Sequence, residues 1–373
     1  MTRVLLSPDK FKGSVTAAEV AAALAAGMTS GDPTWDIVSL PVADGGDGTV
    51  DAAVAAGWDR VRVWTTGPTG SPVDTSYARR GEVAVVELAS SVGLGLLPSG
   101  VPDPLGASTF GLGTVVAHAL TAGARSVVIG LGGSASTDGG AGLLRALGAR
   151  ILDAEGHDLP EGGGSLREAA ELDLAGVLPA ARAATFQLAC DVDNPLLGPL
   201  GATAVYAPQK GADAEQLLVL EQSMMHWASL VGYDSTASGA GAAGGTAYGA
   251  MAVLGATVRS GIDTVLELVD FHTQLQTADL VVTGEGSLDE QSLHGKAPIG
   301  VATAAHRCGV PVVTVSGRIV LSRDRLAEYG VVESYALSDL EPDLGTSIRF
   351  ASTLLRRIGR TIATSTHIFE GVS

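Results

Sequence analysis

Short runs of hydrophobic residues recur along the chain, and each run ends at a charged or glycine-rich turn. Runs this short that are apolar throughout are typical of strands buried on both faces of a parallel sheet. Alanine-rich stretches of helical length lie between them. The alternation predicts an α/β fold, with strands at Val4–Ser7, Ile37–Leu40, Val127–Leu131, Phe186–Ala189, Leu280–Thr283 and Val312–Val315.

The clearest helix is predicted at Ala17–Met28. Thr16 and Glu19 have the spacing of a capping box, in which each side chain bonds the other residue's backbone amide. Gly27 and Gly31 mark the helix exit. In open α/β sheets ligands bind beyond the carboxyl ends of the strands, so we expect the functional residues in the turns that follow the hydrophobic runs.

Composition narrows the class of protein. The chain has 373 residues, 46% of them hydrophobic and 17% charged, which is a globular composition long enough for two domains. A net charge of −17 disfavours a surface that tracks nucleic-acid phosphates. The longest apolar candidate, Val115–Leu131, is interrupted by His118 and Arg125, so we expect no membrane span.

The expected location is the cytoplasm. The N-terminal apolar run is three residues long, much shorter than the ~7–15 residues of a secretory signal core. Cys190 and Cys308 are far apart and form no CxxC or Cys/His metal spacing. Cys190 follows a predicted strand, where it fits a small apolar residue better than a reactive thiolate.

Lysine is scarce, because 19 of the 23 basic residues are arginine. Three of the four lysines adjoin a glycine, in the pairs Lys12-Gly13, Lys210-Gly211 and Gly295-Lys296. A compact ammonium beside a backbone that can approach a ligand closely is suited to phosphate recognition. His294, next to the third pair, is the histidine of most interest.

Two turns are candidates for anion binding. In the first, Lys10, Lys12, Gly13 and Ser14 lie between a predicted strand and the capped helix, so ammonium groups and helix amides face one spot. The second is the run 130–140, whose amides and hydroxyls follow a strand and precede a helix. It contains four further candidates, Gly132, Gly133, Ser134 and Ser136.

The second turn also fits another class of enzyme. The segment is not a Walker A loop, and the chain contains no G-x-x-x-x-G-K-[ST]. It does match G-x-G-x-x-A from Gly130, and Asp153 lies about twenty residues further on, as in dinucleotide-binding units. An NAD-dependent dehydrogenase using the Gly130/Gly132 loop therefore remains an alternative, and an anion-binding protein without catalysis is another.

Carboxylates gather in the same class of turn, at Asp44 and Asp47, at Asp191 and Asp193, and at Glu285. Hard oxygen ligands suit Mg²⁺, and a magnesium that bridges nucleotide phosphates needs only one or two protein carboxylates. A phosphoryl acceptor hydroxyl needs one more as a base or orienting group. The inventory is sufficient for a phosphotransferase.

Over nearly its full length the chain resembles the bacterial type I glycerate kinase family, in the order and spacing of its motifs. One departure is Lys10, where a serine is expected in much of the family. Arg318 lies where family members vary. The matching segments are residues 7–14, 41–49, 132–142, 190–196, 208–212, 241–245 and 283–298.

The resemblance implies two α/β domains, one Rossmann-like with a parallel sheet formed by both chain ends and one inserted. We expect the first at residues 1–65 and 275–373 and the second at 66–274. The implied activity is ATP- and Mg²⁺-dependent phosphorylation of D-glycerate, usually to 2-phosphoglycerate, with the 3-phosphate as the alternative product. A homodimer is possible, and neither nucleic acid nor a membrane is an expected partner.

Within that reading, the candidate residues take three roles. We expect Asp191, Asp193 and Lys296 to be catalytic, with the two aspartates also holding the metal. The nucleotide is expected to contact Lys12, Gly13, Ser14, Gly132, Gly133, Ser134, Ser136 and Lys210. The substrate is expected to contact Lys10, Asp44, Asp47, Glu285 and Arg318.

Overall fold

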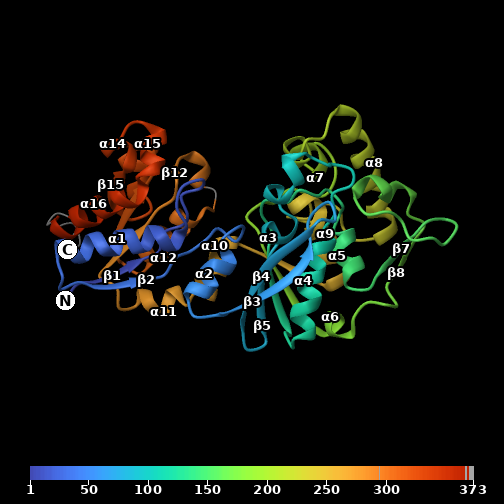
Figure 1. Cartoon of the computed structure of the whole chain (residues 1–373), viewed down its shortest axis with the longest axis horizontal. Helices are drawn as coiled ribbons and strands as arrows, with labels where there is room; N and C mark the ends of the chain where they lie inside the picture. The colour runs from blue at the N-terminus through green and yellow to red at the C-terminus, as the bar shows by residue number, and fades with distance from the viewer. Residues whose placement is uncertain (294, 366–367, 369–373) are drawn as a thin grey trace. The chain divides into compact units, whose positions relative to one another are not determined.

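The computed structural model of the chain describes residues 1–293, 295–365 and 368 (Figure 1). The chain forms two compact units. Unit 1 comprises Met1–Asp44, Asp51–Gly57 and Gly261–Ser373, and unit 2 comprises Gly45–Val50 and Trp58–Ser260. The expected α/β class, with one domain built from both chain ends and another inserted, is confirmed.

The units divide before Trp58 and Gly261, whereas the sequence suggested divisions after residues 65 and 274. The first difference arises because β3 (Asp59–Thr66) pairs along its whole length with β4 (Pro72–Arg80) in the sheet of unit 2. The second arises because α10 (Gly261–Leu268) and α11 (Phe271–Leu275) bury their apolar side chains in a core of unit 1.

Unit 1 contains a five-stranded parallel sheet in the order β15-β13-β11-β1-β2. Counted along the chain this is the order 2-1-3-4-5 of doubly wound folds, in which ligands bind where β1 and the third strand diverge. The strands are β1 (Arg3–Leu6), β2 (Asp36–Ser39), β11 (Leu280–Thr283), β13 (Val312–Ser316) and β15 (Val331–Ala336), with a small parallel pair β12 (Ser287–Leu288) and β14 (Arg318–Ile319).

Helices cover both faces of this sheet. On one face, α1 (Ala17–Gly31) and α16 (Ala351–Thr364) share a core with Val4, Leu6 and Val282. On the other, α10, α11 and α12 (Ala297–Arg307) share a core with Leu5 and Val281. The remaining helices are α2 (Thr49–Ala55), which crosses the division at Val50, and α13 (Arg323–Ala327), α14 (Leu337–Leu340) and α15 (Leu344–Arg349).

The start of α1 bears out its predicted capping box. Thr16 Oγ1 accepts a hydrogen bond from the Glu19 amide at 3.2 Å, and Glu19 Oε2 accepts one from the Thr16 amide at 2.8 Å. The helix does not end at Gly27 but continues to Gly31. The role of Gly27 is to let α16 approach closely. A Cβ on Gly27 would lie 2.1 Å from the Arg356 carbonyl oxygen.

Unit 2 contains a six-stranded sheet in the order β10-β9-β6-β5-β4-β3, parallel from β10 to β5 and antiparallel at β4 and β3. A separate antiparallel pair joins β7 (Arg150–Leu152) and β8 (Glu171–Asp173). The other strands are β5 (Val83–Glu87), β6 (Ser126–Gly130), β9 (Thr185–Ala189) and β10 (Thr257–Arg259). The helices are α3 (Ala89–Val92), α4 (Phe110–Thr121), α5 (Ala141–Ala146), α6 (Pro179–Ala183), α7 (Ala202–Tyr206), α8 (Ala214–Val231) and α9 (Ala242–Leu254).

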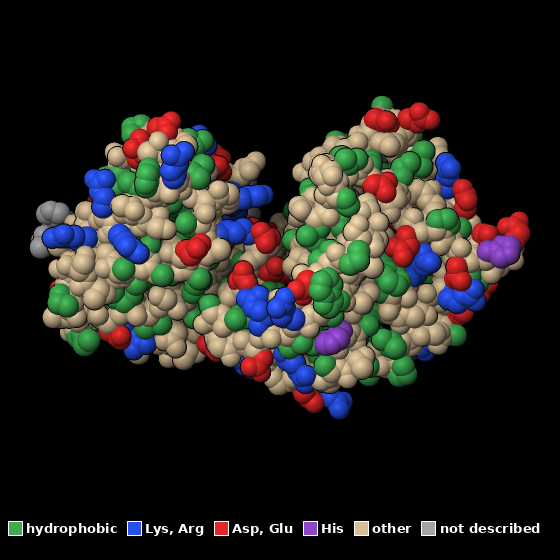
Figure 2. Space-filling model, viewed as in Figure 1, with side chains coloured by type: hydrophobic (Ala, Val, Ile, Leu, Met, Phe, Trp, Pro, Cys, Tyr) green, Lys and Arg blue, Asp and Glu red, His purple; other side chains and the backbone are tan. Residues whose placement is uncertain are grey.

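The surface carries both signs of charge. Figure 2 shows acidic and basic side chains interspersed with hydrophobic ones on the face in view. The most exposed large hydrophobic side chains include Trp64 on the edge strand β3 and Leu344 on α15. Within the described ranges, no helix combines the length and the apolar character needed to cross a membrane.

Candidate functional site

One face of the unit 1 sheet changes from apolar to polar toward the carboxyl ends of β1, β11 and β13. Alternate residues of a strand share a face, and the strand register aligns them in rows across the sheet. Backbone bonds from Ser7 to Val282 and from Asp9 to Gly284, both 2.8 Å, continue the ladder past the end of β1. From the core outward the rows are Leu5, Val281 and Val312; then Ser7, Thr283 and Thr314; then Asp9, Glu285 and Ser316.

A third carboxylate joins this edge from the strand next to β1. After β2, the amides of Leu40 and Val42 bond to the carbonyls of Leu6 and Pro8 at 2.7 and 3.0 Å, so the segment stays extended. Leu40 and Val42 belong to the same core as Leu5, and alternation puts Asp44 on that face beyond them. Carboxylates therefore end three neighbouring strands where the strand order reverses.

The environment of Asp9 and Glu285 disfavours the charged forms of these two carboxyl groups. Burial, followed by the charge of Asp44, raises the pKa of Asp9 to about 7. Lys10 acts in the opposite direction, both by its charge and through its amide, which donates to Asp9 Oδ1 at 2.6 Å. Burial also raises the pKa of Glu285. A carboxyl group whose pKa is near 7, as that of Asp9 is, is suited to proton transfer at neutral pH.

Lysines and a helix terminus complement these acids. Lys296 is the N-cap of α12, and its Nζ lies 3.5 Å from Glu285 Oε2. Because the first amides of a helix carry partial positive charge, the start of α12 favours an anion near Lys296. The structure thus brings together four of the predicted site residues, Lys10, Asp44, Glu285 and Lys296.

The remaining unit 1 candidates lie on neighbouring loops. Lys12 and Gly13 are exposed, and Ser14 Oγ donates to the Ile348 carbonyl at 3.0 Å. Gly13 has a φ of +77°, which is the reason for a glycine there. Arg318 is exposed, with Nη2 3.4 Å from Ser287 Oγ. His294 lies outside the described residues.

In unit 2, the loops that follow β6 and β9 leave adjacent parallel strands. The loop after β6 packs against residues 45–46 through glycines. A Cβ on Gly130 would lie 2.6 Å from the Gly45 carbonyl oxygen, and one on Gly132 would lie 2.9 Å from Gly46 Cα. These close approaches put Asp47, which is exposed, beside the glycine-rich loop.

The glycine-rich loop after β6, residues 130–140, has free amides at one place. The Ala135 amide donates to the Val92 carbonyl and the Ser136 amide to Ser134 Oγ, both at 3.1 Å. Within the described part of the chain, the amides of Gly132, Gly133 and Ser134 donate to no protein group. Three consecutive amides of this kind are what an anion-binding loop offers.

Asp138 holds this loop in place, and sequence reasoning missed it. Its carboxylate is fully buried and accepts hydrogen bonds from the Thr109 amide and hydroxyl, both at 2.7 Å, and from the Gly140 and Gly142 amides at 3.3 and 3.2 Å. Burial still raises its pKa. The signal available in the sequence was its place between the glycine-rich loop and the next helix.

Lys210 is buried beneath the same loop. It ends a short 3₁₀ turn, Pro208–Lys210, is 3% exposed, and its Nζ donates to the Ser136 carbonyl and lies 3.4 Å from Ser134 Oγ. Burial lowers the pKa of its ammonium to about 7, although Asp138 acts to raise it. In this structure the Lys210 side chain thus binds the loop backbone through the Ser136 carbonyl.

We expect this burial to appear in the pH dependence of folding. Between about pH 7 and its usual pKa of 10.5, Lys210 is protonated in the unfolded chain but neutral in the folded one, so raising the pH stabilises the protein. Lys210→Met lacks this titration. The free energy of unfolding of the wild type, relative to the variant, should rise by up to about 1.4 kcal/mol per pH unit from pH 7 to 10 and stay level from pH 5 to 7.

Urea unfolding at a series of pH values measures this difference. Lys12→Met, the same change at an exposed lysine, controls for the loss of a positive charge. A difference between wild type and Lys210→Met that does not change with pH would contradict the proposed titration.

Asp191 and Asp193 lie on the exposed loop after β9. The loop is restrained at Asn194, whose side chain accepts from the Tyr206 hydroxyl at 2.5 Å and donates to the Leu200 carbonyl at 2.8 Å. Among the residues described, no three His, Cys, Asp or Glu side chains are grouped so as to hold a metal. Two exposed carboxylates still suit Mg²⁺, which keeps several waters and takes its other ligands from phosphate.

The neighbouring Cys190 is a buried thiol, and burial raises its pKa to about 11. A reactive cysteine needs a lowered pKa. The interpretation of Cys190 as a small apolar residue is confirmed.

A second glycine-rich segment packs against the first. Ala243, Gly244 and Gly245 have φ values of +53°, +70° and +81°, so the backbone at the start of α9 is left-handed. The Gly244 carbonyl accepts from the Gly139 amide at 3.0 Å. A left-handed alanine is strained, and such strain is commonly kept at functional sites.

The dinucleotide-binding alternative does not fit this architecture. It requires the strand after α5 to lie parallel in the main sheet with an acidic residue at its end. Instead, β7 pairs antiparallel with β8 outside that sheet, and Asp153 caps its own turn by accepting from the His157 amide at 2.8 Å. The lack of a Cβ at Gly130 and Gly132 serves the close approach of Gly45 and Gly46.

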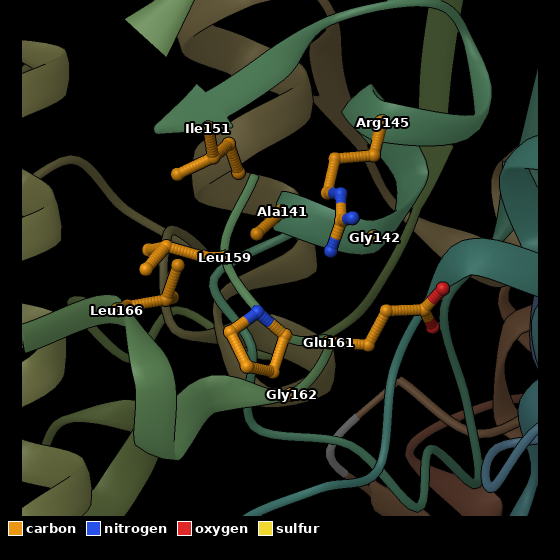
Figure 3. Close-up of a pocket in the computed structure, with 9 residues that line it drawn as sticks. Ala141, Gly142, Arg145, Ile151, Leu159, Glu161, Gly162 and Leu166 are labelled. Atoms are coloured by element: carbon orange, nitrogen blue, oxygen red, sulfur yellow. The ribbon is translucent and has the colours of Figure 1, made fainter. Parts of the chain in front are cut away.

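Unit 2 also has a pocket of about 220 Å³ between α5, β7 and the loop at 159–162 (Figure 3). Ile151, Leu159 and Leu166 line one side, and Arg145 and Glu161 extend from the other. Much of this volume is open to solvent, and the lining contains none of the predicted site residues.

Comparison with known proteins agrees with the sequence resemblance. The family model described as the glycerate kinase family matches residues 4–367. The chain is 43% identical to the glycerate kinase of Bacillus subtilis (strain 168) and 38% identical to the glycerate 2-kinase of Escherichia coli (strain K12), in each case over 97% of both chains. The crystal structure of a proposed glycerate kinase 2 from Salmonella typhimurium LT2 superposes with a TM-score of 0.85 at 39% identity, covering 97% of both chains. The chain therefore belongs to the glycerate kinase family.

Proposed function

We propose that this chain transfers the γ-phosphoryl group of ATP to D-glycerate in a Mg²⁺-dependent reaction that yields 2-phosphoglycerate. The observation that carries the proposal is the set of free amides at Gly132, Gly133 and Ser134 on a loop next to the one that bears Asp191 and Asp193. Phosphoryl transfer depends on positioning and charge neutralisation, for which amides and carboxylates at strand ends are suited.

In this proposal the amides of residues 132–134 bind phosphates of the nucleotide. Lys12, Gly13 and Ser14 keep their predicted role as nucleotide contacts. Ser136 and Lys210 act beneath the loop that follows β6, because their side chains bond to that loop itself. Lys210 is thus expected to hold the phosphate-binding backbone in shape. The sequence analysis expected Lys210 to contact the nucleotide directly, and the proposal replaces that contact with a supporting role.

Asp191 and Asp193 would hold the magnesium ion. When bound, Mg²⁺ neutralises charge on the phosphates and helps to align them. The fixed position of Asn194, held by Tyr206 and the Leu200 carbonyl, restrains the loop that presents these carboxylates. Lys296, at the start of α12, supplies positive charge for phosphate or for the carboxylate of glycerate.

Glycerate is a small anion with two hydroxyl groups. We propose that it contacts Lys10, Asp44, Glu285 and Arg318 of unit 1. Asp47 keeps its predicted role as a substrate contact. A neutral or ionised carboxyl can donate to or accept from a hydroxyl, and lysine or arginine can bind its carboxylate.

The direct test is release of ADP in a coupled assay. We expect turnover that requires both D-glycerate and Mg²⁺, is abolished by EDTA and returns when Mg²⁺ is restored. Heat denaturation in EDTA should give a similar melting temperature, because the proposed metal ligands are exposed and do not hold the core together. A melting temperature raised by ligand without ADP release would indicate a binding protein instead.

The product decides between the two phosphoglycerates. Enolase alone consumes 2-phosphoglycerate, whereas the 3-phosphate also requires phosphoglycerate mutase. We expect the signal with enolase alone to equal the signal with both enzymes. The name glycerate 2-kinase given to the Escherichia coli relative supports the 2-phosphate for this chain.

A further inference from the structure

We propose that Asp9 takes the proton from the reacting hydroxyl of the acceptor, and that the row Asp9, Glu285 and Ser316 at the end of the unit 1 sheet binds the acceptor's hydroxyl groups. This inference rests on the proposed kinase function and adds two residues to it, Asp9 and Ser316. Neither stood out in the sequence.

Unsatisfied polar atoms mark this edge as a ligand site. In the described structure, Ser7 Oγ, Ser316 Oγ and Glu285 Oε1 are buried and have no hydrogen-bond partner. Ser7 and Ser316 are 0% exposed and Glu285 is 8% exposed. Buried polar groups are nearly always satisfied, so each exception calls for a partner. Here all three occur where β1, β11 and β13 end on one face of the sheet.

The chemistry of a polyhydroxy acid matches these groups. Its hydroxyls can donate hydrogen bonds to Glu285 and can both donate to and accept from the serine hydroxyls. Its carboxylate can approach Lys296 and the first amides of α12, which cover the same face.

Asp9 is the carboxylate best placed to act as the base. One of its oxygens is fixed by the Lys10 amide at 2.6 Å, and its own amide is fixed by the Gly284 carbonyl at 2.8 Å. The charged groups around it are Lys10 on its own loop, Asp44 after β2 and Glu285 after β11. Lys296 on α12 and Asp289 act on Glu285 in turn.

The reaction step is balanced as follows. The O–H proton of the acceptor passes to the Asp9 carboxylate as the hydroxyl oxygen forms a bond to the γ-phosphorus of ATP. The bond from that phosphorus to the bridging oxygen breaks, and ADP leaves with the electron pair. The proton on Asp9 is then released to water.

Asp9→Asn tests this role through activity and stability together. We expect wild-type kcat/KM to fall as the pH drops below about 7, because protonated Asp9 cannot accept a proton. The variant should lose at least about 100-fold in kcat and lack this acid limb. Asp36→Asn, at the opposite end of the same sheet, should keep wild-type activity and pH profile.

The same variant should be more stable than the wild type at high pH. Ionising the partly buried Asp9 destabilises the folded chain, and this penalty grows as the pH rises from about 4 to 7. The melting temperature of Asp9→Asn should therefore exceed that of the wild type by more at pH 8 than at pH 5. An active variant that retains the acid limb would overturn the assignment of Asp9.

Ser316→Ala tests the row without removing a charge or a protein hydrogen bond. Because Ser316 Oγ has no protein partner, the variant should fold with an unchanged melting temperature. Titration calorimetry should show D-glycerate binding at least about tenfold more weakly to the variant, with KM for ATP unchanged. Unchanged glycerate affinity would overturn the proposed row.

The two proposals fail in different ways. A wild-type chain that releases no ADP with D-glycerate would refute the proposed function. An active wild type whose Asp9→Asn and Ser316→Ala variants behave like it would leave that function standing and refute this inference alone.

Discussion

Replacing Asp191 by Asn is expected to lower kcat for glycerate phosphorylation by about 10²- to 10³-fold, comparable to the loss of one group that stabilises transition-state charge. The amide keeps the size of the side chain but removes the negative charge proposed to hold magnesium. Because Asp191 is exposed, the melting temperature should change little. Steady-state kinetics over a range of Mg²⁺ concentrations should also show that the variant needs more Mg²⁺ for half-maximal rate.

Asp59→Asn is the matched control, because Asp59 is an exposed aspartate on the edge strand β3 of the same unit. It should retain wild-type turnover and Mg²⁺ dependence. Near-normal activity of Asp191→Asn would remove Asp191 from the mechanism and leave Asp193 as the remaining candidate on that loop.

Gly284→Ala should destabilise unit 1 by at least about 3 kcal/mol. Gly284 links the end of β11 to Glu285, and a Cβ there would lie 1.6 Å from the Val315 carbonyl oxygen. A backbone atom cannot turn aside as a side chain can, so β11 and β13 would have to separate. We expect a clearly lower melting temperature in calorimetry and loss of glycerate binding.

Gly345→Ala provides the comparison within the same unit. Gly345 lies in α15, and a Cβ there would meet only Asp343 Oδ1 at 3.7 Å. Alanine favours helix over glycine, so this variant should be as stable as the wild type or slightly more stable. Equal melting temperatures for the two variants would show that the sheet can accommodate a side chain at Gly284.

The sequence predicted the buried strands best, because they are apolar on both faces. Each of the six predicted runs overlaps a strand of the structure, with ends that differ by at most one residue. The sequence reading also missed β5 (Val83–Glu87), although it is a buried apolar run. Two other missed strands, β3 and β15, are edge strands of another kind. On β3, Trp64 and its alternate neighbours face solvent, and β15 includes Glu333 and Ser334, so neither reads as a continuous apolar run. The apolar pattern of these edge strands is weaker because part of their surface faces solvent and needs no hydrophobic residues.

The candidate site was only partly predictable, for a different reason. Scarcity and neighbouring glycines made Lys12, Lys210 and Lys296 stand out, but the sequence could not reveal that Lys210 is buried against a backbone carbonyl. Asp9 and Glu285 are separated by 276 residues, and only strand pairing makes them neighbours. Roles that depend on such pairing become visible once the register is known.

The construction of unit 1 from both ends of the chain also sets the order of events during synthesis. At roughly 5–20 residues per second, the ribosome needs roughly 15–55 s to reach β11 after making β1. During that interval β1 and α1 have emerged without the strands and helix that cover them, while the intervening unit can already fold. We therefore expect the nascent N-terminal segment, which waits for partners made near the end of synthesis, to gain from protection by chaperones.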